Sequence, residues 1–182
     1  TITHLNSKYF LATRPGQFKY PATYASTDPE ELYQIMQQGG MWIAKPPAGS
    51  LGREVFLISH EDANARVILE TLCGPDKDQF TLLQAYIQGV EKGEKRVLLA
   101  GGKPIGQYRR IAKNDHRNNL HQGASSEMCE LTAQETRYCI ALGAFLKDFG
   151  AEFVGLDLVY PWIIEFNVIN PGGLVTIAEL GG

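Results

Sequence analysis

The sequence predicts an α+β fold in which most strands pair antiparallel. Short segments rich in β-branched and aromatic residues alternate with turns that contain Gly or Pro, as expected for strands. Three longer segments have helical composition, and the whole order reads αββαβββαββ. The segments 96–100 and 104–111 flank Gly101-Gly102 and form the clearest hairpin.

Two helices are marked by their start signals. The first is expected from Asp28, which suits the N-cap and is followed by a proline, with Glu31 in the reciprocal position of a capping box. The other is expected over 132–149, where Thr132 and Glu135 form a second capping box and a glycine follows the last turn.

The remaining elements follow from the same patterns. A third helix is expected over 61–72, and the polar residues 112–127 have no usable period, so we expect a long loop there. No helix is expected after the last strand. The strands are expected at 41–45, 54–58, 80–87, 96–100, 104–111, 152–159 and 162–168.

Composition excludes several classes of protein. The 182 residues are 44% hydrophobic and 20% charged, which suits a globular protein with a real core. A net charge of −3 argues against a nucleic-acid binder, and no apolar run is long enough for a membrane span. The three cysteines lack disulfide or zinc spacing, so we expect free thiols in the cytoplasm.

Three oxygen-bearing side chains are expected on one face of the last two strands. Glu165 and Asn167 are two residues apart and point to the same side of one strand. A hairpin centred near Pro161 places Asp157 roughly opposite Glu165. Like charges repel across a sheet, so Mg²⁺, which prefers oxygen ligands, is the expected counter-ion. The alternative is that the three side chains are solvated on the open face of an edge hairpin.

Positive side chains form the second candidate group. Lys45 ends an apolar strand and precedes a Gly- and Pro-rich loop, 46–52, whose N–H groups suit phosphate oxygens. Arg96 and Arg110 lie on the two strands of the expected hairpin and can share a face, where guanidinium groups suit phosphoryl or carboxylate oxygens. The alternatives are a plain turn beside a surface lysine, and ordinary surface arginines.

The ordered set of motifs resembles that of the ATP-grasp ligases, and most of all bacterial-type glutathione synthetase. The resemblance runs over about residues 6–173. It rests on Asn6-Ser7-Lys8, Lys45-Pro46 with its Gly loop, Gln84-Ala85-Tyr86-Ile87, Glu94-Lys95-Arg96-Val97, Arg110 with Arg117-Asn118-Asn119-Leu120, Gly155-Leu156-Asp157 and Glu165-Phe166-Asn167-Val168.

This resemblance implies a role for each matching residue. It implies an ATP site in which Gln84, Tyr86 and Ile87 line the adenine slot, Leu156 packs under the ring, and Glu94 accepts from a ribose hydroxyl. The ATP-binding residues implied are Lys8, Lys45, Gly49, Ser50, Gly52, Gln84, Tyr86, Ile87, Glu94 and Leu156. The implied Mg²⁺ ligands are Asp157, Glu165 and Asn167, and the implied catalytic residues are Arg96, Arg110, Arg117 and Asn119. The implied acceptor pocket contains Asn170, Gly172 and Gly173.

The resemblance also implies the reaction. ATP converts a carboxylate into an acyl phosphate, and an amine then displaces phosphate; the expected substrates are γ-glutamylcysteine and glycine. Residues 112–125 are expected to act as a lid. The alternatives are a ligase that adds glutamate to ribosomal protein S6, a non-catalytic ATP-binding fragment or subunit that needs a partner, and a small-molecule kinase.

The resemblance implies two lobes with mixed or antiparallel sheets that clamp ATP. We expect an N-terminal segment over 1–26, a smaller nucleotide-clamping lobe over 27–88 and a catalytic lobe over 89–182. The first residue is Thr1, so we expect that the chain is part of a longer protein or is processed. The expected context is therefore a homo-oligomer, or a missing N-terminal substrate domain or subunit, with small-molecule substrates only.

Overall fold

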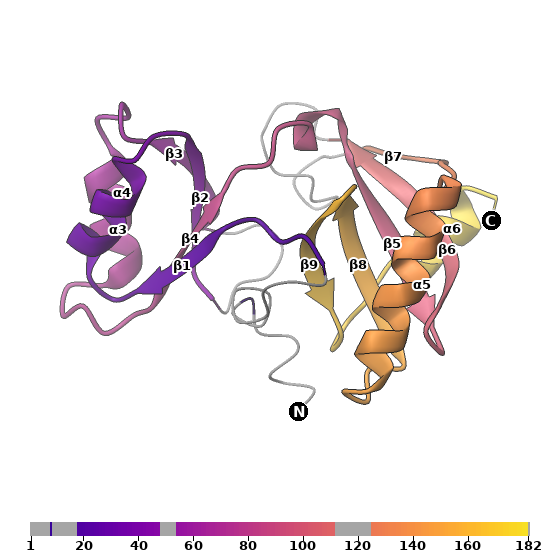
Figure 1. Ribbon diagram of the computed structural model, residues 1–182. Helices are drawn as coiled ribbons and strands as arrows, with labels where there is room; N and C mark the ends of the chain where they lie inside the picture. The colour runs from indigo at the N-terminus through magenta and orange to yellow at the C-terminus, as the bar shows by residue number, and fades with distance from the viewer. Residues whose placement is uncertain (1–7, 9–17, 48–53, 112–124, 182) are drawn as a thin grey trace.

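Two antiparallel sheets organise the molecule (Figure 1). The computed structural model describes residue 8 and residues 18–47, 54–111 and 125–181. One sheet has four strands and the other has five, and helices pack against each sheet. The predicted α+β class with antiparallel pairing is confirmed.

The first part of the described chain forms a small lobe around the four-stranded sheet, whose order is β1-β4-β2-β3. Fully buried residues of both helices, such as Leu32 and Leu69, meet Ala44 and Leu83 of the sheet in one core. The elements of the small lobe are β1 (Thr23–Ser26), α3 (Pro29–Met36), β2 (Met41–Lys45), β3 (Phe56–Ser59), α4 (Ala65–Cys73) and β4 (Thr81–Ala85).

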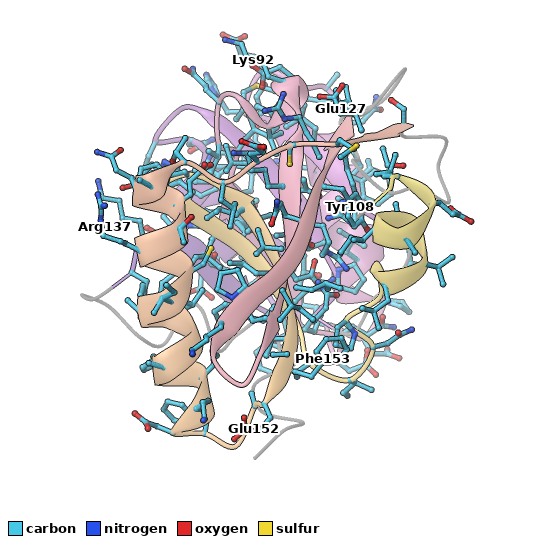
Figure 2. All side chains as sticks on the ribbon, turned by 90° about the vertical axis from the view of Figure 1, so that its right-hand side faces the viewer. Lys92, Tyr108, Glu127, Arg137, Glu152 and Phe153 are labelled. Atoms are coloured by element: carbon cyan, nitrogen blue, oxygen red, sulfur yellow. The ribbon has the colours of Figure 1, made fainter. Side chains whose placement is uncertain are left out.

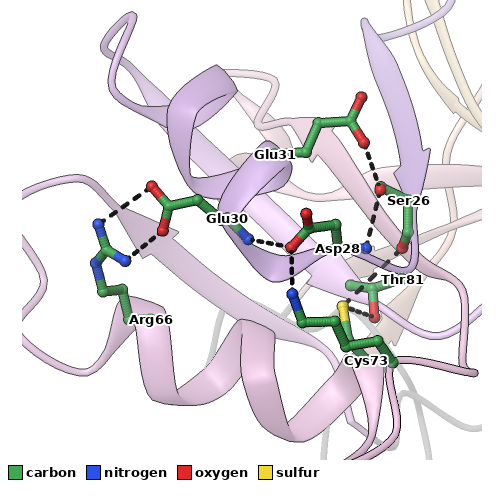
Figure 3. A network of polar contacts seen from close by, with 8 residues as sticks. Ser26, Asp28, Glu30, Glu31, Arg66, Cys73 and Thr81 are labelled. Atoms are coloured by element: carbon green, nitrogen blue, oxygen red, sulfur yellow. Dashed lines mark hydrogen bonds and ion pairs between the residues drawn. The ribbon is translucent and has the colours of Figure 1, made fainter.

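The start of α3 is fixed by side-chain hydrogen bonds (Figure 3). The Asp28 carboxylate accepts from the Glu30 N–H at 3.1 Å, which confirms the predicted N-cap. Glu31 accepts from the Ser26 hydroxyl at 2.6 Å, and the Ser26 oxygen accepts from the Asp28 N–H at 3.0 Å. The capping box predicted for Glu31 is therefore wrong, because the Ser26 hydroxyl lies between the Glu31 carboxylate and the Asp28 N–H.

The second part forms a large lobe around the five-stranded sheet, whose order is β7-β6-β5-β8-β9. A short 3₁₀ helix, η1 (Val90–Lys92), precedes it. Its elements are β5 (Glu94–Ala100), β6 (Lys103–Ile111), β7 (Ser125–Glu127), α5 (Ala133–Lys147), β8 (Phe153–Val159), β9 (Trp162–Asn167) and α6 (Leu174–Glu179).

The five-stranded sheet has two different faces, and Figure 2 shows α5 and α6 on opposite sides of its strands. On the α5 face, Val97 and Leu99 pack with Leu142 and Leu146 in an apolar core. Because strand side chains alternate, the positions between these residues point to the α6 face. The polar residues of the candidate site lie there.

Helix α5 begins as predicted. The Thr132 hydroxyl accepts from the Glu135 N–H at 3.2 Å, and the Glu135 carboxylate accepts from the Thr132 N–H at 2.7 Å, so the capping box is confirmed. Lys95 of β5 adds an ion pair to Glu135 at 2.7 Å. These contacts attach the start of the helix to the central strands of the sheet.

Helix α6 corrects the prediction that no helix follows the last strand. The helix and the segment before it can approach the sheet because two strand positions are glycines. A Cβ at Gly106 would lie 2.8 Å from Ile177 Cδ1, and one at Gly155 would lie 2.5 Å from the Pro171 carbonyl oxygen. Glycine at these two strand positions therefore lets the C-terminal segment lie close to the polar face. The sequence pattern also missed the short strands β1 and β7.

Candidate functional site

Arg96 and Asp157 form the centre of a buried polar cluster on the α6 face. They are Cα partners in the pairing of β5 with β8. The guanidinium donates to both carboxylate oxygens, through Nε at 2.5 Å and Nη2 at 3.1 Å. Both side chains are more than nine-tenths buried, so the pair gains strength from the low local dielectric.

Arg110 of β6 joins this pair from the other side. Its Nη2 lies 2.7 Å from Asp157 Oδ1 and also contacts the Glu94 carboxylate. The prediction that Arg96 and Arg110 share a face is therefore confirmed. Burial alone would raise the pKa of Asp157, but Arg110 and Arg96 outweigh burial and hold that pKa below its ordinary value.

The oxygen-bearing face of the last hairpin is also present. Asp157 and Glu165 are Cα partners in the β8–β9 pairing, as predicted. The Asn167 amide nitrogen lies 3.3 Å from Asp157 Oδ2, so these two side chains converge. The counter-ions in this structure are Arg96 and Arg110, which the sequence-based argument for a metal did not include.

Glu94 begins β5 and is buried beside Arg110. Burial raises the pKa of Glu94 from 4.5 to about 7, although the charge of Arg110 opposes this rise. Within the described residues, Arg110 Nε is a buried side-chain nitrogen without a hydrogen-bond partner. The cluster therefore contains a carboxyl group, Glu94, whose pKa is close to neutral pH, and an arginine, Arg110, with an unused donor. The predicted contact of Glu94 with a ribose stays a prediction.

Lys45 brings the small lobe to the same site. It is 6% exposed, and its ammonium donates to the Gln84 side-chain oxygen at 2.9 Å. Burial lowers the pKa of Lys45 from 10.5 to about 8; the charge of Glu165 opposes this shift, and that of Lys8 adds to it. The charges of Glu165, Glu94 and Asp157 each act to raise the pKa of Lys45, so its ammonium lies within electrostatic range of the cluster of the large lobe.

Two predicted adenine-slot residues lie at the connection between the lobes. The Tyr86 N–H donates to the Met41 carbonyl oxygen, and the Tyr86 hydroxyl donates to Glu91 at 3.2 Å. The Ile87 carbonyl accepts from the Val90 N–H at the start of the 3₁₀ helix. Their role in binding adenine stays a prediction.

Leu156 does not fit its predicted role. It is fully buried in the apolar core on the α5 face, whereas Asp157 points to the α6 face. Neighbouring residues of a strand point to opposite faces, so both cannot line one nucleotide slot.

The segment after β9 reaches the cluster through its backbone. The Pro171 carbonyl oxygen accepts a hydrogen bond from Arg96 Nη1. Gly173 lies against the Tyr108 ring and, like Gly172, has a positive φ, which favours glycine. Asn170 is exposed. Two of the predicted acceptor-pocket residues, Gly172 and Gly173, therefore adjoin Arg96.

Several predicted residues lie outside the described part of the chain. They are Gly49, Ser50, Gly52, Arg117 and Asn119. Among the residues that the structure describes, no group of three or more His, Cys, Asp or Glu side chains could hold a metal ion. The predicted ligand set has two carboxylates and an amide, so this finding does not bear on it. No helix in the described ranges has the length and apolar character of a membrane span.

Solved structures with the same arrangement identify the fold. D-cycloserine synthetase DcsG matches with a TM-score of 0.72 at 17% identity, over 97% of this chain and 66% of that chain. The ATP-grasp ligase PsnB, complexed with a phosphomimetic variant of its minimal precursor, Mg and ADP, matches with a TM-score of 0.68 at 18% identity, over 97% and 54%. The fold is therefore the ATP-grasp fold.

The chain belongs to the prokaryotic glutathione synthetase ATP-grasp domain family, whose model matches residues 10–182. Glutathione synthetase of Agrobacterium fabrum (strain C58) is 35% identical over 163 residues, which cover 89% of this chain and 51% of that protein. The chain thus spans about half the length of the curated relatives it matches. The predicted family and fold are confirmed.

Proposed function

We propose that this chain provides the nucleotide-binding and catalytic part of an ATP- and Mg²⁺-dependent carboxylate–amine ligase. The observation that carries the proposal is the buried cluster of Arg96, Arg110 and Asp157 in the large lobe. The charges of Asp157 and Glu165 also act on the buried ammonium of Lys45 in the small lobe. Such a cluster can bind a polyanion between two sheets, because its cations are desolvated and already oriented.

The chemistry of the reaction suits these side chains. A carboxylate becomes reactive when ATP converts it to an acyl phosphate, and an amine then displaces phosphate to form an amide. Lys8 and Lys45 bind the phosphate oxygens in this proposal, and Arg96 and Arg110 stabilise the negative charge that gathers on the transferred phosphoryl group. The buried position of both arginines excludes water from these contacts.

The donor set of the last hairpin fits Mg²⁺. Asp157, Glu165 and Asn167 each offer a hard oxygen ligand, and the Asn167 amide lies beside the Asp157 carboxylate. These three residues would hold the ion, which supplies charge neutralisation to the phosphates when bound. Two arginines also contact Asp157, so metal affinity should depend on how this carboxylate is shared.

The proposed substrates are γ-glutamylcysteine and glycine, and the relatives named glutathione synthetase support this choice. A cytoplasmic location is part of the proposal and is supported by three free cysteines. The lobe limits 27–88 and 89–182 are kept as a proposal for the working units, with β1 added to the smaller lobe because it pairs with β4. A homo-oligomer, or a separate N-terminal substrate domain or subunit, stays a prediction. Light scattering of the chain alone measures its oligomeric state.

Phosphate release from ATP tests the function. We expect release that depends on Mg²⁺, γ-glutamylcysteine and glycine together, and that Glu165→Ala lowers by at least about a hundredfold. An exposed carboxylate on the same sheet provides the control, because Glu127→Ala should leave the rate unchanged. Nucleotide binding without turnover would favour a non-catalytic subunit, and turnover with glutamate and ribosomal protein S6 in place of these substrates would contradict the substrate assignment.

A further inference from the structure

A line of hydrogen bonds runs from Lys45 across three neighbouring strands. The Lys45 ammonium donates to Gln84 Oε1 at 2.9 Å. Gln84 Nε2 donates to Thr23 Oγ1 at 3.0 Å, and the Thr23 hydroxyl donates to the Pro21 carbonyl oxygen at 2.9 Å. β4, which carries Gln84, lies between β1 and β2, so these contacts cross the sheet from its edge to the site.

The donors and acceptors of these groups allow only one orientation of the Gln84 amide. A carbonyl oxygen only accepts, so the single Thr23 hydroxyl proton goes to Pro21 and the Thr23 oxygen accepts from Gln84. The Gln84 amide must therefore turn its nitrogen to Thr23 and its oxygen to Lys45. The opposite orientation would place the amide N–H₂ against the ammonium and the amide oxygen against a hydroxyl oxygen whose proton is already used.

The Thr23 end of this series of hydrogen bonds is held by backbone contacts. The Ala22 carbonyl accepts from the Ala85 N–H at 2.8 Å, directly beside the Gln84–Thr23 contact, and Pro21 is itself buried. Gln84 is 5% exposed, so a wrongly turned amide could not be satisfied by bulk water. The Thr23 hydroxyl oxygen therefore holds the nitrogen end of the Gln84 amide and, together with the ammonium of Lys45, fixes the orientation in which the amide oxygen faces the lysine.

We propose that Thr23 is a positioning residue that holds Lys45 in place for a nucleotide phosphate by fixing the orientation of the Gln84 amide. This inference rests on the proposed function, in which Lys45 binds ATP. An ammonium has three donors, so one bond to Gln84 orients the group and leaves two donors for phosphate oxygens. Thr23 itself does not touch the nucleotide.

Substitution of Thr23 tests the inference in calorimetric titrations of the chain with MgADP. Thr23→Val keeps the shape of the side chain and removes the hydroxyl, so we expect MgADP affinity to fall about three- to tenfold, the size of one neutral hydrogen bond. Thr23→Ser restores the hydroxyl and should restore most of the affinity. Thr71→Val is the matched control, because the Thr71 hydroxyl donates to the Val67 carbonyl on the exposed side of α4.

A double-mutant cycle separates positioning from a general structural effect. In a Lys45→Met background, Thr23→Val should change MgADP affinity less than twofold, because the residue through which Thr23 acts is missing. An unchanged affinity in Thr23→Val alone, or an equal loss in both backgrounds, would overturn the inference. If Thr23→Val does not fold, Thr23→Ala enters the same cycle with the same criteria.

The cycle also distinguishes this inference from the proposed function. If Lys45→Met binds MgADP as tightly as the unaltered chain, the nucleotide site is wrongly placed and both proposals fail. If Lys45→Met abolishes most of the affinity while Thr23→Val does not affect it, only the positioning role fails.

Discussion

Lys45 is a charged residue at a position that is 6% exposed, and its pKa of about 8 reflects the free-energy cost of burying the charged ammonium. The unfolded chain binds this proton more tightly than the folded protein, since an exposed lysine has a pKa near 10.5. The penalty is fully present below pH 8 and disappears as the pH rises to about 10.5. At neutral pH it is on the order of 3 kcal/mol.

Replacement of Lys45 should therefore stabilise the nucleotide-free protein. Lys45→Met keeps most of the apolar stem and removes the charge, but it leaves the Gln84 oxygen without its donor. We expect a net gain of about 1 kcal/mol in the free energy of unfolding at pH 7, measured in urea, and no gain at pH 9.5, where the penalty on the charged lysine has fallen by about 2 kcal/mol. Lys77→Met on the surface should change little, because its partner Asp28 is also exposed. A destabilised Lys45→Met at pH 7 contradicts this account.

The site residues differ in how far the sequence could predict their placement. Asp157 and Glu165 belong to one hairpin, so strand periodicity and a turn suffice to bring them together. The pairing of Arg96 with Asp157 joins residues 61 positions apart, and no local pattern encodes which strands of a sheet become neighbours. The same reason hid the contact of Gln84 with Thr23, which are also 61 positions apart.

At the scale of elements, the C-terminal segment depends on two glycines of the sheet to approach the site. Its helix was missed because α6 has only six residues and its N-cap, Gly173, makes no side-chain capping bond. Strand β1 was missed because four residues are too few for a clear alternation, and its place at the sheet edge comes from β4. Longer elements such as α5 had both a cap and a period, and they were predicted within a few residues.

In the proposed ligase reaction, a change at Gly155 should act mainly on the binding of the acceptor amine. An added Cβ would lie 2.5 Å from the Pro171 carbonyl, so Gly155→Ala must displace the segment that holds the predicted acceptor pocket and the Arg96 contact. We expect the KM for glycine to rise about tenfold, while MgADP affinity changes less than twofold. Steady-state kinetics and calorimetry measure the two effects.

The control for this prediction lies on the other face of the sheet. A Cβ at Gly143 of α5 would lie 2.3 Å from the Gly102 carbonyl oxygen, so Gly143→Ala meets an equally close backbone atom away from the site. It should lower the free energy of unfolding by about 1–3 kcal/mol without a change in the KM for glycine. An equal rise in KM for both variants would mean that the Gly155 effect is general loss of structure.

At the scale of the molecule, the two lobes are not consecutive blocks of sequence. Phe18 precedes the whole small lobe, yet it lies in the core of the large lobe, 5.5 Å from the Tyr138 ring and 5.6 Å from the Phe145 ring. The Lys19 carbonyl accepts from the Ile163 N–H at 2.9 Å, and the chain then enters β1 of the other sheet. The segment 18–22 therefore makes a second connection between the sheets, in addition to the one that leads from β4 to β5.

Phe18→Ala should consequently weaken the large lobe, although the residue stands before the small lobe in the sequence. The side chain is 7% exposed, so we expect a loss of about 3 kcal/mol in the free energy of unfolding. Amide hydrogen exchange should speed up in α5 and β9 and stay unchanged in α3 and α4. Phe80→Ala, at a side chain that is 53% exposed, should cost less than about 1 kcal/mol. Faster exchange confined to the small lobe would show that residue 18 belongs to that lobe instead.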